Sequence, residues 1–233
     1  MDASRLTFEV HPASRVLVDA AERIAAALGE CLEASGSASL ALSGGNSTVG
    51  LCEALARMPI DWKAVDVFQV DERAVPPDHE DSNFRLIELH LLRRLGPAAP
   101  RCVRMRAEVP DPHEAARSYA AGLPSRLDVV VLGIGPDGHT ASLFPGSALL
   151  DETTARVAVI DDSPKPPPRR MTLTLPTLNA ARWVFGIAIG EGKREIVRRL
   201  RAGEDLPASR VQPACWFLDP AAAGEDAEAP TSS

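Results

Sequence analysis

The sequence predicts an α/β fold with a doubly wound, mainly parallel sheet and helices on both of its faces. Short apolar runs rich in β-branched residues alternate with longer stretches in which apolar residues recur every three or four positions. Residues 127–134 (LDVVVLGI) are apolar almost throughout, which is typical of a central parallel strand buried on both faces. Ligands of such sheets bind beyond the carboxyl ends of the strands, so polar clusters at those ends are the candidate site residues.

The first half of the chain shows this alternation clearly. Residues 14–35 predict an outer helix, because their apolar positions form one helical face. A short strand at 39–42 runs into a glycine turn and then a helix at 48–58, while 65–70 (VDVFQV) predicts a second strand. A helix is expected at 82–95, with Ser82 as a plausible cap at its start.

The second half continues the pattern after a helix at 112–123 and the buried strand at 127–134. Residues 161–170 (DDSPKPPPRR) contain four prolines and predict a stiff extended loop, because proline removes backbone donors and excludes helix. The remaining expected elements are strands at 155–160, 171–175, 183–189 and 214–218 and a helix at about 193–201.

Composition bounds the class of protein. The chain has 233 residues, enough for one sizeable domain, expected at 1–220, followed by a tail at 221–233 that lacks large apolar residues and predicts disorder. Its 25 Lys and Arg against 32 Asp and Glu leave a net charge of −7, which argues against nucleic-acid binding. The chain shows no signal-peptide or membrane-spanning pattern, and its cysteines lack CxxC spacing. We expect a reduced, cytoplasmic monomer without a metal.

The first candidate cluster is the loop 43–47, Ser43-Gly44-Gly45-Asn46-Ser47, between the strand at 39–42 and the next helix. Adjacent glycines allow a tight turn with exposed N–H groups, and a helix start adds partial positive charge, so phosphate would be favoured there. The loop is not a Walker loop, because no Gly-Lys-Ser/Thr follows. A plain strand-to-helix turn capped by Ser47 remains the alternative.

The second cluster, Asp71-Glu72-Arg73, follows the strand at 65–70, and Asn83 lies ten residues beyond it as a possible orienting amide. An exposed ion pair of little energetic consequence is the simpler interpretation of such a triplet. Its position at a strand end favours a role in binding.

The third cluster is the glycine turn 133–142 (GIGPDGHTAS), directly after the buried strand. Gly135 and Gly138 allow close backbone approach, and His139 can take a proton near neutral pH. A histidine beside Asp137 in such a turn is a candidate general base, although most single histidines are structural.

The same turn also satisfies the GxGxxG pattern of dinucleotide-binding proteins, with Asp161 about twenty residues further on. Two features weaken that alternative. Asp137 would place a carboxylate beside a pyrophosphate, and Pro145-Gly146 interrupts the chain before a full crossover helix can form.

The fourth cluster, Gly190-Glu191-Gly192-Lys193, lies where the strand at 183–189 meets the next helix. A lysine in a first helical turn opposes the helix dipole unless an anion is bound there. Lys193 is therefore a candidate anion ligand, and a solvated lysine without a role is the alternative.

Six motifs in this order resemble the 6-phosphogluconolactonase family, over about residues 39–201. They are SGG at 43–45, DER at 71–73, DSN at 81–83, GIGPDGHTASLFPG at 133–146, RMTLTLPTLN at 170–179 and GEGK at 190–193. Glucosamine-6-phosphate deaminases share the fold, the SGG loop and the glycine turn. They place a glutamate five residues after the histidine and an aromatic residue after the Asp-Glu pair, where this chain has Phe144 and Arg73. Asn46 departs from the usual SGGS.

The resemblance implies hydrolysis of 6-phospho-D-glucono-1,5-lactone, a small sugar-phosphate partner, without metal or other cofactor. His139 would deprotonate the attacking water, and Asp137 would orient His139. N–H groups of the turn 135–138 could donate to the oxyanion. The substrate-binding candidates are Ser43, Gly44, Gly45, Asp71, Arg73, Asn83, Gly135, Gly138, Arg170 and Lys193. Of these, Arg73, Lys193 and the Gly44-Gly45 backbone would hold the phosphate.

Three alternatives remain beside this interpretation. A serine hydrolase would use Ser43 or Ser142, but residues 41–45 (ALSGG) lack the first glycine of a nucleophile elbow. A deaminase-like isomerase and a non-catalytic sugar-phosphate binding module are the others.

Overall fold

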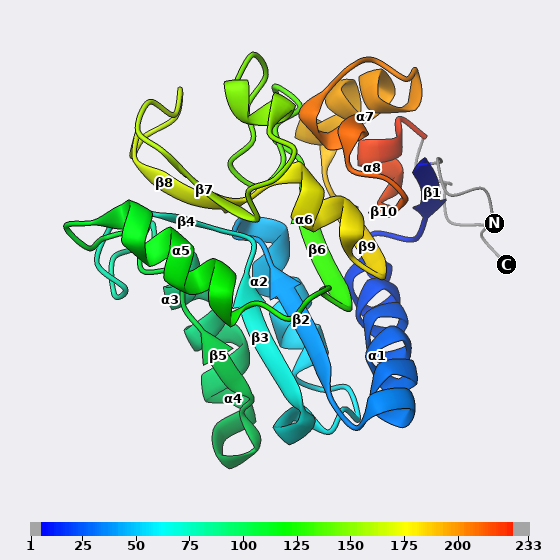
Figure 1. Ribbon diagram of the computed structural model, residues 1–233. Coiled ribbons are helices and arrows are strands. Elements are labelled where there is room, and N and C mark those ends of the chain that lie inside the picture. Colours follow the sequence, from blue (N-terminus) through cyan, green and yellow to red (C-terminus); the bar gives the residue numbers. More distant parts are fainter. Residues whose placement is uncertain (1–5, 226–233) are drawn as a thin grey trace, which may run out of the picture.

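Seven parallel strands form the main sheet in the computed structural model, which describes residues 6–225 (Figure 1). Their order across the sheet is β1-β10-β9-β6-β2-β3-β5. The strands are β1 (Leu6–Val10), β2 (Ala38–Leu42), β3 (Val65–Gln69), β5 (Arg101–Val103), β6 (Val129–Gly133), β9 (Trp183–Ala188) and β10 (Ala214–Leu218). All their pairings are parallel, and the predicted doubly wound α/β fold is confirmed.

Helices cover both faces of this sheet. The α-helices are α1 (Val16–Ser35), α2 (Asn46–Leu55), α3 (Asn83–Ile87), α4 (Arg93–Leu95), α5 (Pro112–Gly122), α6 (Leu175–Ala180), α7 (Arg194–Arg201) and α8 (Pro220–Ala223). Alternate side chains of β2 enter two different apolar clusters: Leu40 and Leu42 pack with α1 and α2, and Ala41 packs with α5, α6 and α7. The period of two in a strand thus divides the core between the two faces. Within residues 6–225, no helix is both long and apolar enough to span a bilayer.

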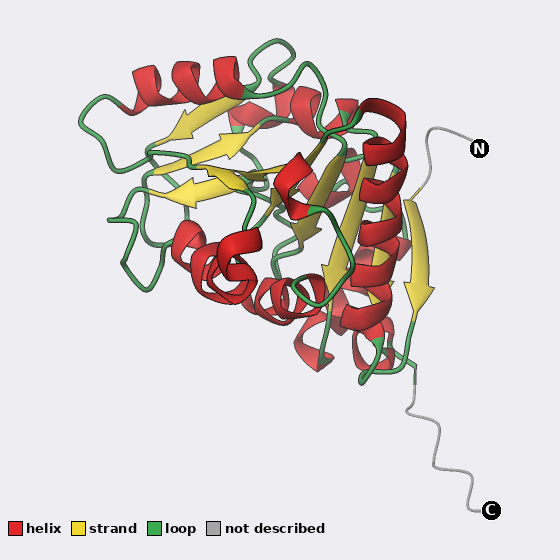
Figure 2. Cartoon of the chain, turned by 90° about the horizontal axis from the view of Figure 1, so that it is seen from below, coloured by secondary structure: helices red, strands yellow, loops and turns green. Residues whose placement is uncertain are grey.

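A second, three-stranded antiparallel sheet stands apart from the main sheet, in the order β4-β8-β7 (Figure 2). Its strands are β4 (Asp71–Arg73), β7 (Val157–Ile160) and β8 (Arg170–Leu173). The sequence predicted strands at 155–160 and 171–175 but not this separate sheet, and it treated residues 71–73 as a strand end. The correction matters for the site, because β4 and β8 pair Arg73 directly with Arg170.

Several boundaries also differ from the predictions. The edge strands β1 and β5 were missed because they are short and carry polar residues. The six-residue helix α6 was also missed, and its first residue, Leu175, was assigned to the preceding strand. The helix expected at 82–95 is three successive segments, with the π-helical Glu88–Leu92 between α3 and α4. Short 3-10 turns are Trp62–Ala64, Gly96–Ala98, Ala148–Asp151, Glu191–Lys193 and Pro207–Arg210.

The predicted disordered tail and the proline-rich loop need smaller corrections. Residues 221–223 belong to α8, and Ala222 of this helix is fully buried, so the prediction of a disordered tail is wrong for these residues. Residues 226–233 of the predicted tail lie outside the described residues. Asp219 caps α8 by accepting the N–H of Ala222. The proline-rich segment is a loop as predicted up to Arg169, while Arg170 begins β8.

Candidate active site

A cavity of about 340 Å³ opens at the carboxyl ends of β2 and β6. These two strands are neighbours at the point where the strand order reverses: the chain continues from β2 to β3 on one side and from β6 to β9 on the other. Ligands bind at such a switch point because the loops leaving the two strands diverge and leave a crevice between them. The predicted site residues that line this cavity are Ser43, Gly44, Gly45, Asp71, Arg73, Asn83, Gly135, His139, Arg170 and Lys193.

The loop after β2 forms one wall of the site cavity. Gly45 directly precedes the first residue of α2 and has a φ of 106°, a backbone angle that favours glycine. A Cβ on Gly44 would lie 1.8 Å from Oδ1 of Asn83, so this position also requires glycine. No side chain caps α2 within the described chain, and Asn46, Ser47 and Thr48 at its start line the cavity. The helix start therefore presents the polar backbone that suits an anion.

The glycine turn after β6 forms the opposite wall and holds the histidine. Nδ1 of His139 lies 2.5 Å from Oδ1 of Asp137, and the imidazole packs against the ring of Phe144 at 4.7 Å. The N–H of Gly135 donates to the carbonyl of His139, and the N–H of Gly138 donates to the carbonyl of Gly135. These two glycine N–H groups are occupied within the turn, so in this conformation they are not free to stabilise an oxyanion, and the oxyanion donors stay a prediction.

Gly138 has a structural place in this turn. Its φ is 87°, and a Cβ there would lie 2.8 Å from Leu206. It is not among the residues that line the cavity, unlike Gly135. Between 134 and 147 the chain makes turns where a dinucleotide-binding protein would begin its crossover helix. The GxGxxG pattern here belongs to a histidine-holding turn.

His139 is arranged as a base. The Asp137 carboxylate accepts from Nδ1, which places the ring proton on that nitrogen and leaves Nε2 with a free lone pair. Burial lowers the pKa of His139, Asp137 opposes this effect, and the nearby ammonium of Lys165 adds to it. Burial raises the pKa of Asp137, but its hydrogen bond to His139 and the charges of His139 and Lys165 outweigh burial and bring it below its usual value. The neutral imidazole and the ionised carboxylate are thus the favoured pair near neutral pH.

Three cationic side chains of the described residues line the cavity, although the protein is acidic overall. Arg73 and Arg170 are register partners on β4 and β8, and Arg170 is 4% exposed. Burial lowers the pKa of Arg170, and the charge of Arg73 lowers it further. Nζ of Lys193 donates to the carbonyl of Ile134 at 2.6 Å, and burial, then the charge of Lys165, lowers its pKa. Like charges that line one cavity and are partly removed from water favour an anion there.

Arg73 has an unsatisfied donor. Its Nη1 donates to the carbonyl of Asp81 at 2.6 Å, whereas its buried Nε has no partner within the described residues. The guanidinium of Arg73 therefore has one donor that no described residue uses. Lys193, the other predicted anion ligand, lies at the end of a 3-10 turn and directly precedes α7, rather than inside the helix as predicted.

A polar network beneath the cavity holds Asp71 in place. Ser142 Oγ donates to Oδ2 of Asp71 at 2.7 Å, and Nδ2 of Asn83 donates to its carbonyl and to Oδ1. Ser43 Oγ donates to the carbonyl of Val131 at 2.9 Å. Within the described part of the chain neither serine hydroxyl is hydrogen-bonded to a histidine, and both serines are buried, so the geometry opposes a serine nucleophile.

Glu72 lies next to the site residues Asp71 and Arg73 but was not predicted as a site residue. Its carboxylate is 1% exposed and accepts the backbone N–H groups of Arg73, Asn83 and Phe84, each at 2.8 Å. Gln69 Nε2 and Ser82 Oγ donate to it as well. Burial raises the pKa of Glu72, and the N–H donors oppose that rise. Glu72 therefore ties the start of α3 to β4, and with it the cavity residues on both.

Replacement of Glu72 by glutamine should lower the free energy of unfolding by about 2 kcal/mol or more, because an amide NH₂ would face N–H donors and leave them unpaired. Urea denaturation followed by circular dichroism measures this change. Glu80→Gln, at an exposed carboxylate on the same connection, is the matched control and should change stability by no more than about 0.5 kcal/mol. Equal stability of the two variants would contradict the anchoring role.

Lys165 is the second residue that the sequence analysis missed. It lies in the proline-rich loop, and its Nζ is 3.3 Å from both Oδ1 of Asp137 and Nδ1 of His139. A single lysine among prolines ahead of Arg170 was the available signal. As for metals, residues 6–225 bring together no group of three or more His, Cys, Asp or Glu side chains that could hold one.

The structure is thus an α/β protein with a His–Asp pair and three cationic side chains at the switch point of its parallel sheet, the groups that general-base chemistry on an anionic substrate would need. Residues 12–217 match the family model described as glucosamine-6-phosphate isomerases/6-phosphogluconolactonase, and the chain belongs to this family. The resemblance inferred from the motifs is confirmed.

Curated relatives and solved structures agree with this assignment. The chain is 48% identical over 168 residues to a 6-phosphogluconolactonase of Homo sapiens, a match that covers 66% of this chain and 65% of that protein, just under two thirds. It is 41% identical to the 6-phosphogluconolactonase of Rattus norvegicus over 87% of this chain and 86% of the relative. A crystal structure of 6-phosphogluconolactonase from Thermotoga maritima superposes with a TM-score of 0.83 at 26% identity, covering 92% of this chain and 100% of that one.

Proposed function

We propose that this chain hydrolyses 6-phospho-D-glucono-1,5-lactone to 6-phospho-D-gluconate, the second step of the oxidative pentose phosphate pathway. The observation that carries the proposal is one cavity in which His139, hydrogen-bonded to Asp137, faces the same space as Arg73, Arg170 and Lys193. A base at one place and cations at another fit a substrate that has a reactive carbonyl and a remote phosphate. The lactonase names of the relatives support the same substrate.

In the proposed reaction, Nε2 of His139 takes a proton from water as the water oxygen bonds to C1 of the lactone. Asp137 keeps the ring proton on Nδ1 and stabilises the imidazolium that forms. The electron pair of the carbonyl moves to its oxygen and returns as the bond from C1 to the ring oxygen breaks. The imidazolium then gives its proton to the departing ring oxygen, which leaves an open-chain carboxylic acid that ionises in water. The scheme uses only groups of the chain and needs no serine nucleophile.

The phosphate is proposed to lie between the loop after β2 and the cationic side chains. Arg73 and Lys193 supply charge-assisted hydrogen bonds, and the Gly44-Gly45 backbone allows close approach. Arg170 lines the same cavity and joins this set. Fixing the phosphate positions C1 near His139, which is where orientation accelerates the reaction.

The surroundings of His139 favour lactone hydrolysis over deamination. Phe144 occupies the position five residues after the histidine, is 3% exposed and packs on the imidazole. The deaminase pattern has a glutamate there, and an apolar ring cannot exchange protons with an amino sugar. Arg73 likewise stands where that pattern has an aromatic residue.

The decisive assay generates the lactone in place from glucose 6-phosphate and follows its loss with and without the protein. We expect the protein to accelerate this loss. Binding of sugar phosphates without acceleration would support a binding module instead, and ammonia release from glucosamine 6-phosphate would support a deaminase. Loss of turnover in Ser43→Ala, together with labelling by a covalent serine probe, would replace the water-attack scheme.

Lys193→Ala should raise KM for the phosphorylated lactone by about tenfold or more and change kcat little, because a charged hydrogen bond to a remote phosphate is lost. Arg73→Ala should act in the same direction. The unphosphorylated glucono-1,5-lactone provides the internal comparison, since its kcat/KM should be unaffected in either variant. Lys63→Ala is the matched control, because Nζ of Lys63 also donates to a backbone carbonyl, that of Ala99, outside the cavity. An equal loss with both lactones would contradict a phosphate contact.

A further inference from the structure

The proline-rich loop between β7 and β8, at the upper left of Figure 1, carries a cation to the candidate base. Nζ of Lys165 lies 3.3 Å from Oδ1 of Asp137 and 3.3 Å from Nδ1 of His139. Twenty-six or more residues separate this lysine from the other two side chains in the sequence. Neither the cavity lining nor the reaction scheme above uses this lysine.

The loop is fastened to the site through Arg170. The guanidinium of Arg170 donates to the carbonyls of Lys165, Pro166 and Pro167 at 3.1 to 3.2 Å. Ser163 Oγ donates to the carbonyl of Lys165 at 3.0 Å. Because Arg170 is buried and also lines the cavity, the backbone that bears Lys165 is held in a defined place. The ammonium is therefore positioned by the fold, although its side chain is 38% exposed.

The hydrogen-bond chemistry decides what this ammonium can do. Oδ1 of Asp137 accepts from Nδ1 of His139 and from Nζ of Lys165, so the two donors share one oxygen. Nδ1 already carries a proton, so it cannot accept from the lysine as well. The Lys165 ammonium and the imidazole therefore do not hydrogen-bond to each other, and their positive charges repel once His139 is protonated.

We propose that Lys165 is a positioning residue of the lactone hydrolysis: it shares Asp137 Oδ1 with His139 and disfavours positive charge on the imidazole, so that Nε2 stays free to accept a proton at lower pH. This inference rests on the proposed function and adds to it a group that sets the working pH range. It also gives the proline-rich loop a role in the site.

Other groups around His139 also raise or lower its pKa. Burial is the first cause that lowers the pKa of His139, and Asp137 and Asp71 oppose it, while Lys165 acts in the same direction as burial. Phe144 covers one side of the ring, and the Arg170 guanidinium lies over Phe144 at 5.6 Å from its centroid. Removing only the Lys165 charge leaves the carboxylates in place, so the pKa of His139 should rise.

The test compares the pH dependence of kcat/KM in the wild-type protein and in Lys165→Met, which keeps the length of the side chain. kcat/KM rises with pH as His139 loses its proton, and its acid limb reports the free enzyme. The limb should move to higher pH in Lys165→Met. The rate relative to wild type should then be at least about threefold lower at pH 5.5 than at pH 8, and Lys165→Arg should restore the wild-type profile.

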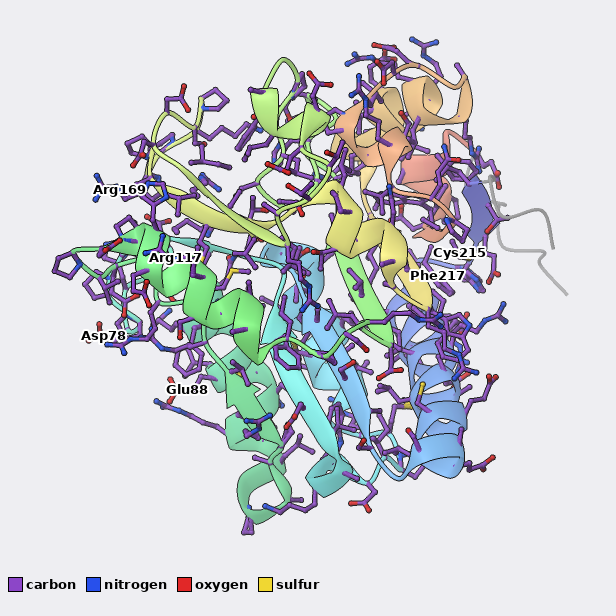
Figure 3. The ribbon with its side chains drawn as sticks, in the orientation of Figure 1. Asp78, Glu88, Arg117, Arg169, Cys215 and Phe217 are labelled. Atoms are coloured by element: carbon purple, nitrogen blue, oxygen red, sulfur yellow. The ribbon has the colours of Figure 1, made fainter. Side chains whose placement is uncertain are left out.

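Arg169→Met is the matched control. Arg169 is a cation in the same loop, but its Nε donates to the exposed Asp161 at 2.8 Å, and Figure 3 shows it at the outer edge of the molecule. The acid limb of Arg169→Met should match that of the wild type. Salt separates charge from loop structure: because Lys165 is partly exposed, added salt should move the acid limb of the wild type upward relative to that of Lys165→Met, in which only the carboxylates are screened. An acid limb that moves equally in Lys165→Met and Arg169→Met, or that responds to salt equally in the wild type and Lys165→Met, would overturn the proposal.

A titration of His139 by NMR, on the unliganded protein, keeps the inference independent of activity. The Cε1 proton of His139, assigned by its absence in His139→Gln, should titrate at higher pH in Lys165→Met than in wild type. An unshifted titration would reject the role of Lys165 even if the lactone is hydrolysed. A shifted titration in a protein without lactonase activity would retain the electrostatic coupling and reject only the proposed function.

Discussion

Replacement of His139 by alanine is expected to lower kcat for the phosphorylated lactone by about 10²-fold or more, which is the usual contribution of a positioned base. Among residues 6–225, His139 is the one histidine that lines the site cavity, and its partner Asp137 holds it with Nε2 free. KM should change much less, because the phosphate is held elsewhere in the cavity. The coupled assay with lactone generated from glucose 6-phosphate measures both constants.

The matched control for this prediction is His90→Ala. His90 also pairs with a carboxylate, Glu53, at 3.1 Å, but on the helical segments away from the cavity. Its removal should leave kcat within about twofold of wild type while changing stability slightly. A His139→Ala enzyme with wild-type turnover would show that water is activated by another group.

The second large effect is expected for Gly135→Ala. A Cβ at this position would lie 2.0 Å from both Cε1 and Nδ1 of His139 and 2.6 Å from Oδ1 of Asp137. No adjustment of a flexible chain end relieves these contacts, so the imidazole and the carboxylate must move apart. A displacement of about 1 Å is enough to reduce kcat by about 10²-fold. Steady-state kinetics measure the loss without removing any functional group.

Gly122→Ala provides the comparison, because a Cβ there meets no atom within 4 Å and its φ is not in the left-handed region. That variant should have wild-type kcat and similar stability. Circular dichroism and urea unfolding of Gly135→Ala would separate a displaced histidine from an unfolded protein. A folded Gly135→Ala protein with full activity would mean that the observed His139–Asp137 geometry is not the reacting one.

The fold class and the glycine turns were predictable because local chemistry specifies them. The apolar run at 127–134 reflects a strand buried on both faces, and the helical period at 14–35 reflects a helix buried on one face; the structure contains β6 and α1 there. The edge strands β1 and β5 were not predicted. They are three to five residues long and are stabilised mainly by pairing with β10 and β3, which no local pattern reports.

The candidate site likewise has a part that the sequence predicted and a part that it did not. His139 and Asp137 are two residues apart, so their pairing could be inferred from one turn. Lys165 approaches that pair only because Arg170 holds the proline-rich loop, and its nearness depends on contacts across 26 or more residues. Glu72 was passed over because an Asp-Glu-Arg triplet does not indicate which carboxylate becomes buried.

Residue types and their local order were therefore enough to identify an α/β fold, a base-bearing glycine turn and a set of cations in an acidic chain. The arrangement of those cations followed from strand pairing. The antiparallel pairing of β4 with β8 places Arg73 beside Arg170, and the strand order places the loops after β2 and β6 on either side of one cavity. Both depend on contacts between segments distant in the sequence, whose register is set by burying both faces of the sheets rather than by any neighbouring residue.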